Sequence, residues 1–445
     1  MDAVLLARIQ FAMTIGFHFL FPPITIGLAW LLVIAEYLGW RRSDPAWVAA
    51  GRFFAKLLAL TFAVGVATGI VMEFQFGTNW ATYSGFVGDI FGAPLAAEAV
   101  IAFFLESGFL GLYLFGRDRV SQRVHWLSIL LVAVGATISA FWIIVANSWQ
   151  QTPAGFVVNQ QAGRAELTSF LDAVLNPSTG LRFLHTLLAS LVAGAFFMAG
   201  VSARMTLKGK GGDVAPRTLR LALAVGLAAS VLVAFPSGHE HARQVAHTQP
   251  AKFAAIEGLY ATQHGAPMVF FALPGVESPH LHASLEIPNV LSYLAFGDPH
   301  ARVQGIEDFP PDEIPPLWLT FVSFHNMVLL GLLFIGLSLL GVLLWWRKKL
   351  DRSRRFLWMI LLASPLPLAA CQFGWAAAEV GRQPWIVYKL LRTSDAASAA
   401  VAPSEILASI ILLGLVYLLL LGLYLFLLRR EIDHGPASPA PQEVK

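Results

Sequence analysis

Long apolar stretches separated by polar connections dominate the chain. Nine of them hold about 20 or more mostly apolar residues: about 12–37, 53–74, 94–115, 126–147, 182–203, 217–236, 319–346, 357–378 and 405–428. A helix needs about 20 such residues to cross the hydrocarbon core of a bilayer. The pattern therefore predicts an all-α integral membrane protein with nine transmembrane helices. The first stretch is too long for the core of a cleaved signal peptide and contains Pro22-Pro23, so we interpret it as a span.

Composition supports this interpretation. Hydrophobic residues make up 57% of the chain and charged residues 13%, whereas a soluble domain carries roughly a quarter of its residues as charged ones. These values argue strongly against a soluble enzyme and against disorder. The single cysteine, Cys371, cannot form an intrachain disulfide and cannot alone hold an iron–sulfur cluster.

The positive charges predict the orientation of the spans. The connections 38–52, 116–125, 204–220 and 347–355, together with the C-terminal tail, hold 20 of the 30 Lys and Arg residues, and the alternate set of connections holds nine. Cytoplasmic loops carry the excess of Lys and Arg. We therefore expect the N-terminus outside, the C-terminus in the cytoplasm and the long 238–318 segment facing outward. We expect one membrane domain, 1–445, that contains 238–318 as an ordered loop.

Three residues inside spans are candidate haem ligands. His18 lies in the first span without a charged neighbour, His185 lies in the first turn of the fifth, and Met327 lies about two turns into the seventh. Neutral imidazole is a common axial ligand of haem iron, and a His/Met pair holds a low-spin haem. At this point His18 can equally be a core histidine bonded to a facing helix, and Met327 an ordinary packing residue.

The third span carries two acids, Glu98 and Glu106, and no Lys or Arg. On an uninterrupted helix they lie about 80° apart, two turns apart in depth. An unpaired carboxyl group in a low-dielectric interior is expected to hold its proton. Two such groups along one helix suit a proton relay, and the alternative is a pair of neutral acids that form hydrogen bonds across helices.

The end of the eighth span carries a compact polar group. Glu379 and Arg382 are three residues apart, with Trp375 before them and Trp385 after them. A surface salt bridge would account for the Glu–Arg pair, but not for the aromatic residues so close to it.

Taken together, these motifs resemble subunit I of the cytochrome bd-type quinol oxidases. The resemblance runs over nearly the whole chain, from ARIQFAMTIGFHFLFPPITIG at the start, through the GRQPW block preceded by a glutamate, to the ninth span. The chain has the shorter form of the family's outward quinol-binding loop, called the Q loop. It also carries His325 where many members have arginine, two residues before Met327.

The resemblance implies a set of haem ligands. His18 matches the axial ligand of one high-spin haem, and Glu379 matches the ligand of the other, with Arg382, Trp375 and Trp385 around it. His185 and Met327 match the ligands of the low-spin haem b. The implied cofactors are a low-spin haem b, a high-spin haem b and a haem d, the last replaced by a third haem b in some members.

The resemblance also implies proton and quinol sites. Glu98, Glu106 and Ser139 match polar positions of a proton channel, and Lys252 and Glu257 match quinol-binding residues of the Q loop. We expect the last two to lie on the outward loop, away from the haem ligands.

These matches imply an electrogenic terminal oxidase of the bacterial inner membrane. It would oxidise quinol at the outer face and reduce O2 to water with cytoplasmic protons, generating a proton motive force without pumping. A subunit II is the implied partner, in some members with small single-span subunits. The alternatives are a haem b-only, cyanide-insensitive quinol oxidase of the same family and, from another class, a proton-coupled membrane transporter.

Overall fold

The computed structural model describes residues 2–274 and 281–436. Within them, nine helical segments are long and apolar enough to cross a membrane, as the sequence predicts: Ala3–Arg42, Pro45–Thr78, Ala81–Phe115, Gln122–Gln151, Thr179–Leu207, Val214–Thr248, Leu317–Trp346, Arg354–Val380 and Pro403–His434. Most are longer than the apolar stretches of the sequence, because the helices continue through polar residues at their ends.

The spans are built from thirteen α-helices and two π-helical turns among the described residues. The α-helices are α1 (Ala3–His18), α2 (Pro22–Arg42), α3 (Pro45–Thr78), α4 (Ala81–Ala97), α5 (Phe104–Phe115), α6 (Gln122–Gln151), α8 (Thr179–Leu207), α9 (Val214–Leu232), α10 (His239–Thr248), α13 (Leu317–Trp346), α14 (Arg354–Ala363), α15 (Leu366–Val380) and α16 (Pro403–His434). The π-helical turns are Glu98–Phe103 and Val233–Gly238.

Two spans are broken α-helices where the sequence suggested continuous ones. The first is interrupted between His18 and Pro22, because proline at the start of α2 supplies no backbone N–H to continue the preceding helix. The eighth is interrupted between Ala363 and Leu366, where Pro365 precedes α15. The first break places the His18 side chain at the end of a helix, within the bundle.

The helix α8 is the central element of the bundle. In its most apolar window 72% of the residues are buried, against 11% in α16. Two glycines allow α8 and α2 to cross closely, since a Cβ at Gly194 would lie 2.6 Å from the Cα of Gly27. Small residues at helix crossings of this kind are typical of membrane bundles. The long apolar face of α16 remains open in this single chain.

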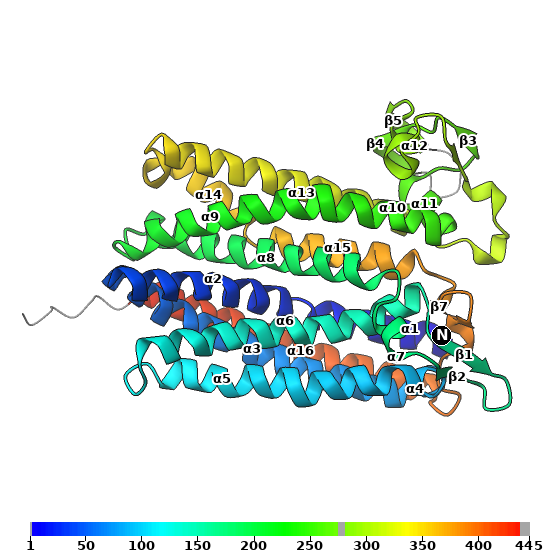
Figure 1. Cartoon of the computed structure of the whole chain (residues 1–445), viewed down its shortest axis with the longest axis horizontal. Helices are drawn as coiled ribbons and strands as arrows, with labels where there is room; N and C mark the ends of the chain where they lie inside the picture. Colours follow the sequence, from blue (N-terminus) through cyan, green and yellow to red (C-terminus); the bar gives the residue numbers. More distant parts are fainter. Residues whose placement is uncertain (1, 275–280, 437–445) are drawn as a thin grey trace, which may run out of the picture.

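The non-helical connections gather mainly at one end of the bundle, together with the N-terminus (Figure 1). In the described residues, the connections at this end of the bundle contain the short helices α7 (Phe170–Val174), α11 (Pro250–Glu257) and α12 (Val290–Phe296) and four two-stranded antiparallel sheets. The pairs are β1–β2 (Phe156–Asn159, Arg164–Leu167), β3–β6 (Gln263–His264, Arg302–Val303), β4–β5 (Met268–Pro274, Leu281–Ile287) and β7–β8 (Trp385–Val387, Leu391–Arg392). This is the end that the charge distribution predicts to face outward.

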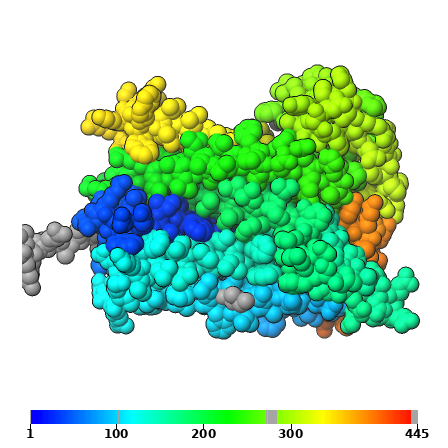
Figure 2. Space-filling model, in the orientation of Figure 1, coloured from blue at the N-terminus to red at the C-terminus, as the bar shows by residue number. Residues whose placement is uncertain are grey.

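The segment between α9 and α13 forms a lobe at this end of the molecule (Figure 2). Its first part continues the sixth span as the helix α10, so the loop begins about ten residues later than the sequence suggested. His325 of α13 fixes the lobe to the bundle, with Nε2 3.1 Å from the carbonyl oxygen of Val269 and its ring stacked on Phe321. The His325 ring therefore packs against Phe321 and bonds to the lobe at the same time.

Candidate functional site

A cavity of about 1810 Å³ extends through the part of the bundle nearest the lobe. Single ligand sites are typically 300–1,000 Å³, so the cavity has room for more than one large group. Every predicted site residue except Trp385 lines it: His18, Glu98, Glu106, Ser139, His185, Lys252, Glu257, Met327, Trp375, Glu379 and Arg382. Residues from at least seven helices and more than 350 positions apart in sequence thus line one cavity.

His18 lines the cavity, and one of its ring nitrogens contacts Thr68 of α3. Its Nδ1 lies 3.0 Å from the hydroxyl oxygen of Thr68, and that hydroxyl also lies 3.0 Å and 2.9 Å from the backbone carbonyls of Val64 and Gly65 in its own helix. When the hydroxyl donates to one of these carbonyls, its oxygen accepts from Nδ1–H and the lone pair of Nε2 stays free. Orientation of a ligating histidine by a partner on its other nitrogen is typical of metal sites.

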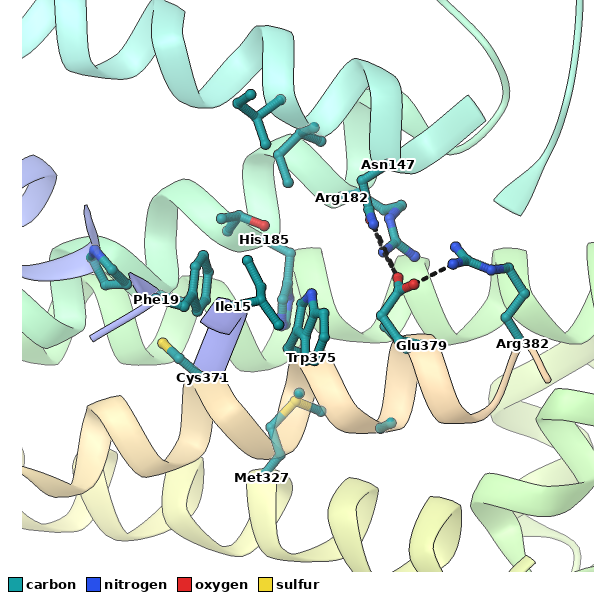
Figure 3. Close-up of a pocket in the computed structure, with 18 of the residues that line it drawn as sticks. Ile15, Phe19, Asn147, Arg182, His185, Met327, Cys371, Trp375, Glu379 and Arg382 are labelled. Atoms are coloured by element: carbon teal, nitrogen blue, oxygen red, sulfur yellow. Dashed lines mark hydrogen bonds and ion pairs between the residues drawn. The ribbon is translucent and has the colours of Figure 1, made fainter. Parts of the chain in front are cut away.

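His185 and Met327 reach the cavity from α8 and α13, and Figure 3 draws both with Trp375 of α15. His185 Nδ1 lies 3.4 Å from the hydroxyl of Ser237, in the π-helical turn. The Met327 thioether packs against Gly374, where an added Cβ would lie 2.7 Å from Sδ. The glycine thus gives the sulfur its place in the cavity wall.

Glu379 lies at the centre of a buried polar network (Figure 3). Oε2 accepts a hydrogen bond from Arg382. Oε1 accepts from Asn147 Nδ2 at 3.0 Å and from Gln151 Nε2 at 3.1 Å, and it lies 3.8 Å from Nη2 of Arg182. A carboxylate offers about four lone-pair positions, so Oε2 keeps one direction free. The surface salt bridge considered above is wrong, since Arg382 is only 5% exposed.

Trp385 is the one predicted site residue outside the cavity lining. Its backbone carbonyl accepts from Nε of Arg382 at 3.3 Å, and its ring lies 5.0 Å from the guanidinium of Arg392. The backbone of Trp385 therefore helps to hold the Arg382 side chain in position.

Of the three proton-channel candidates, Ser139 and Glu98 are in contact, whereas the Glu106 carboxyl group is hydrogen-bonded to neither of them. The Ser139 hydroxyl donates to Glu98 Oε1 at 2.7 Å. Glu106 is 8% exposed and lies against Gly135, and its carboxyl group makes no hydrogen bond within the described part of the chain. The π-helical turn that starts at Glu98 separates the two acids, so the angle between them differs from the 80° of an uninterrupted helix.

Lys252 and Glu257 belong to α11, and both are buried, at 5% and 7% exposure. The Lys252 ammonium donates to Gln151 Oε1 at 3.0 Å and to the carbonyl of Ala378 at 2.8 Å. Burial, together with the charge of Arg182, holds the pKa of Lys252 well below its usual range. Burial also raises the pKa of Glu257 to about 8. The expectation of separation from the ligands is wrong for Lys252, because its ammonium contacts the carbonyl of Ala378, the residue before Glu379.

The sequence analysis overlooked three residues of the network around Glu379. Arg182 is a charged residue in the first turn of a span, and the rule that singled out His185 applies to it equally. Asn147 and Gln151 lie four residues apart at the end of the fourth span, on one helix face. Neutral amides near a span end are common, so that signal is weak.

The fold and the site define a polytopic membrane protein that encloses a cavity walled by candidate iron ligands. The sequence model of cytochrome bd terminal oxidase subunit I matches residues 6–436. Cytochrome bd ubiquinol oxidase subunit 1 of Bacillus subtilis is 42% identical over 446 residues, which cover 98% of this chain and 94% of that protein. Cytochrome bd-II ubiquinol oxidase subunit 1 of Escherichia coli is 35% identical over 503 residues, covering 98% of each.

Solved structures agree. The bd oxidase from Geobacillus thermodenitrificans superimposes with a TM-score of 0.91 at 30% identity, covering 97% of this chain and 99% of that one. The chain belongs to the cytochrome bd terminal oxidase subunit I family.

This family is haem-containing, and the residues here fit haem. The cavity is large and mainly apolar, and it is lined by two imidazoles, a thioether and a carboxylate with one open position. These are ligand types that hold haem iron or bind iron generally.

Proposed function

We propose that this chain is the haem-bearing subunit of a quinol:oxygen oxidoreductase of the bacterial inner membrane. The observation that carries the proposal is the shared cavity, which the candidate ligands, the acids Glu98 and Glu106 and the buried loop residues all line. The relatives named as ubiquinol oxidases support the substrate class.

In this proposal, His18 holds one high-spin haem, Glu379 the other, and His185 with Met327 the low-spin haem b. The haems supply electron transfer and oxygen reduction when bound, with haem d or a third haem b at the oxygen site. Arg382, Asn147 and Gln151 keep the Glu379 carboxylate ionised and oriented through their hydrogen bonds. Trp375 packs against the cavity beside them.

Quinol oxidation is assigned to the end of the cavity formed by α11. Two protons leave the quinol hydroxyls as it becomes quinone, and a buried group must receive the first. Glu257 is suited to this, since its carboxyl group has no hydrogen-bond partner in the described chain and its pKa lies at about 8. Lys252 lines the same cavity, and its ammonium keeps one N–H beyond those given to Gln151 and Ala378, with which it would orient the substrate oxygen.

The protons that oxygen reduction consumes are assigned to Glu106, Glu98 and Ser139. Reducing one O2 to water takes four protons, and Glu106 lies deeper in the bundle than Glu98, toward the end predicted to be cytoplasmic. When electrons and protons reach the site from opposite sides, charge is separated without a pump. Each elementary charge moved against 100 mV costs about 2.3 kcal/mol.

The proposal includes a partner and an orientation. The relatives are named as subunit 1, so we infer a subunit II, with small single-span subunits as further candidates. The open face of α16 offers apolar area for such a contact. The charge distribution supports an N-terminus outside and a cytoplasmic C-terminus.

The test is an absorption spectrum of the purified membrane complex, followed by oxygen uptake with a soluble quinol. A red-shifted chlorin band together with b-type bands supports haem d, and b-type bands alone support the haem b-only variant. A complex without haem would contradict the oxidase and favour the transporter.

A further inference from the structure

Two buried guanidinium groups face a single carboxylate at the centre of the cavity. Arg182 and Arg382 are 8% and 5% exposed, and Glu379 lies between them. Glu379 is the only carboxylate in interaction range of Arg182 within the described residues. Arginine does not lose its proton in proteins, and a buried charge without a counter-ion is costly. The two guanidinium groups therefore carry more positive charge than Glu379 balances, and a further anion would neutralise the excess.

Arg182 is the less satisfied of the two arginines. Its Nη2 donates to Asn147 Oδ1 at 2.5 Å and lies 3.8 Å from Glu379. Its Nε is buried and has no hydrogen-bond partner in the described part of the chain. By contrast, Arg382 uses Nε, Nη1 and Nη2 on protein acceptors. Arg182 also lines the cavity directly, so an incoming acceptor can reach it.

Arg182 lies one helical turn before His185 in α8. The two lie three residues apart in α8, so they share a helix face. Arg182 is closer to the end of the bundle that carries the lobe, by about 4.5 Å along the helix axis. A planar cofactor held at His185 would meet Arg182 at its edge on that side.

We propose that Arg182 binds a carboxylate of the cavity's cofactor, a propionate of the haem held by His185 and Met327. The inference rests on the proposed function, because it requires that haem. The planar guanidinium group can donate two parallel hydrogen bonds to one carboxylate. In Arg182, Nε and a neighbouring Nη can supply these two donors. Arg182 is a positioning residue that also sets the electrostatic field at this haem.

The test is a spectroelectrochemical titration of the purified complex, with wild type, Arg182→Gln, Arg182→Lys and Arg164→Gln compared. Arg164 is the matched control, an exposed arginine of β2 at the same end of the bundle. We expect Arg182→Gln to lower the midpoint potential of the low-spin haem, because loss of a nearby positive charge favours the oxidised iron. Arg182→Lys should restore most of the potential, and Arg164→Gln should leave it unchanged.

The alternative is a purely structural Arg182 that only supports Asn147 and Glu379. It predicts an altered high-spin signal with an unshifted low-spin potential in Arg182→Gln, and that result would overturn the inference. If Arg182→Gln loses the low-spin haem, recovery of its band in Arg182→Lys supports the inference, and loss in both variants overturns it. A wild-type complex without haem would overturn the proposed function itself, and this inference with it.

Discussion

Lys252 donates a hydrogen bond to the backbone carbonyl of Ala378, with Nζ and O 2.8 Å apart, immediately before Glu379. The same ammonium donates to Gln151 Oε1, and the amide nitrogen of Gln151 donates to Glu379 Oε1. The lobe is thus tied to the carboxylate of α15 by two routes. The proposed site of quinol oxidation and the proposed iron ligand therefore form one continuous wall.

The first prediction concerns this wall. Lys252→Ala and Glu257→Ala should each lower quinol oxidation by about 100-fold while preserving the bands of the low-spin haem b. Lys252→Ala should also perturb the high-spin bands slightly, because the carbonyl of Ala378 and Gln151 lose a donor. The measurements are quinol-dependent oxygen uptake and the reduced-minus-oxidised spectrum. Glu286→Ala, at an exposed position of β5, is the control. Unchanged uptake in both α11 variants would mean that these residues are structural.

The second prediction is a pH dependence. Burial raises the pKa of Glu257 to about 8. Below that pH the side chain carries its proton and cannot accept another, and above it the carboxylate can. Quinol oxidation should therefore rise as pH increases through about 8. Glu257→Gln should remove this limb from the profile of kcat/KM, whereas a limb that persists in the variant would assign it to another group.

The third prediction tests the low-spin ligands. His185→Ala and Met327→Leu should each remove the low-spin haem b signal and leave a high-spin signal, because in the proposed assignment each side chain would supply one of the two protein ligands of that haem. Electron paramagnetic resonance and absorption spectra report the change. A full low-spin spectrum in both variants would contradict the assignment.

The fourth prediction concerns the contact between Gly374 and the sulfur of Met327. A Cβ at Gly374 would lie 2.7 Å from Met327 Sδ, so Gly374→Ala must move that flexible side chain. We expect the low-spin band to shift or weaken while the complex still assembles, since the end of a methionine side chain adapts at low cost. Gly336→Ala in α13 is the control, because nothing lies within 4 Å of its added Cβ. Equal spectra for the two variants would place the sulfur away from iron.

The fifth prediction concerns Glu106. Glu106→Gln keeps the size of the side chain but removes its ability to release a proton. Oxygen reduction should slow by about 100-fold, while electron entry from quinol stays fast and the low-spin haem accumulates in its reduced form. Steady-state redox level and oxygen uptake are measured together, with Glu405→Gln at the start of α16 as the control. Normal uptake would mean that protons take another path.

The sequence by itself determined the number of long apolar segments and singled out most of the predicted residues that line the cavity. Apolar length is a local property, because each span must satisfy its backbone hydrogen bonds within its own helix. Nine candidate spans could therefore be read from the chain, and the described residues contain nine helical segments long and apolar enough to cross a membrane. His18, Glu106 and Glu379 stand out in such spans because ionisable groups are rare there.

Only the tertiary structure decided which of these residues meet. The spacing along one helix does not report how helices cross, so the junction of Arg182, Asn147 and Gln151 at Glu379 could not be inferred. The break after His18 and the π-helical turn at Glu98 change side-chain directions without changing hydrophobicity. Lys252 is buried because a polar loop returns to the bundle. The hydrophobic pattern of the sequence does not predict that contact.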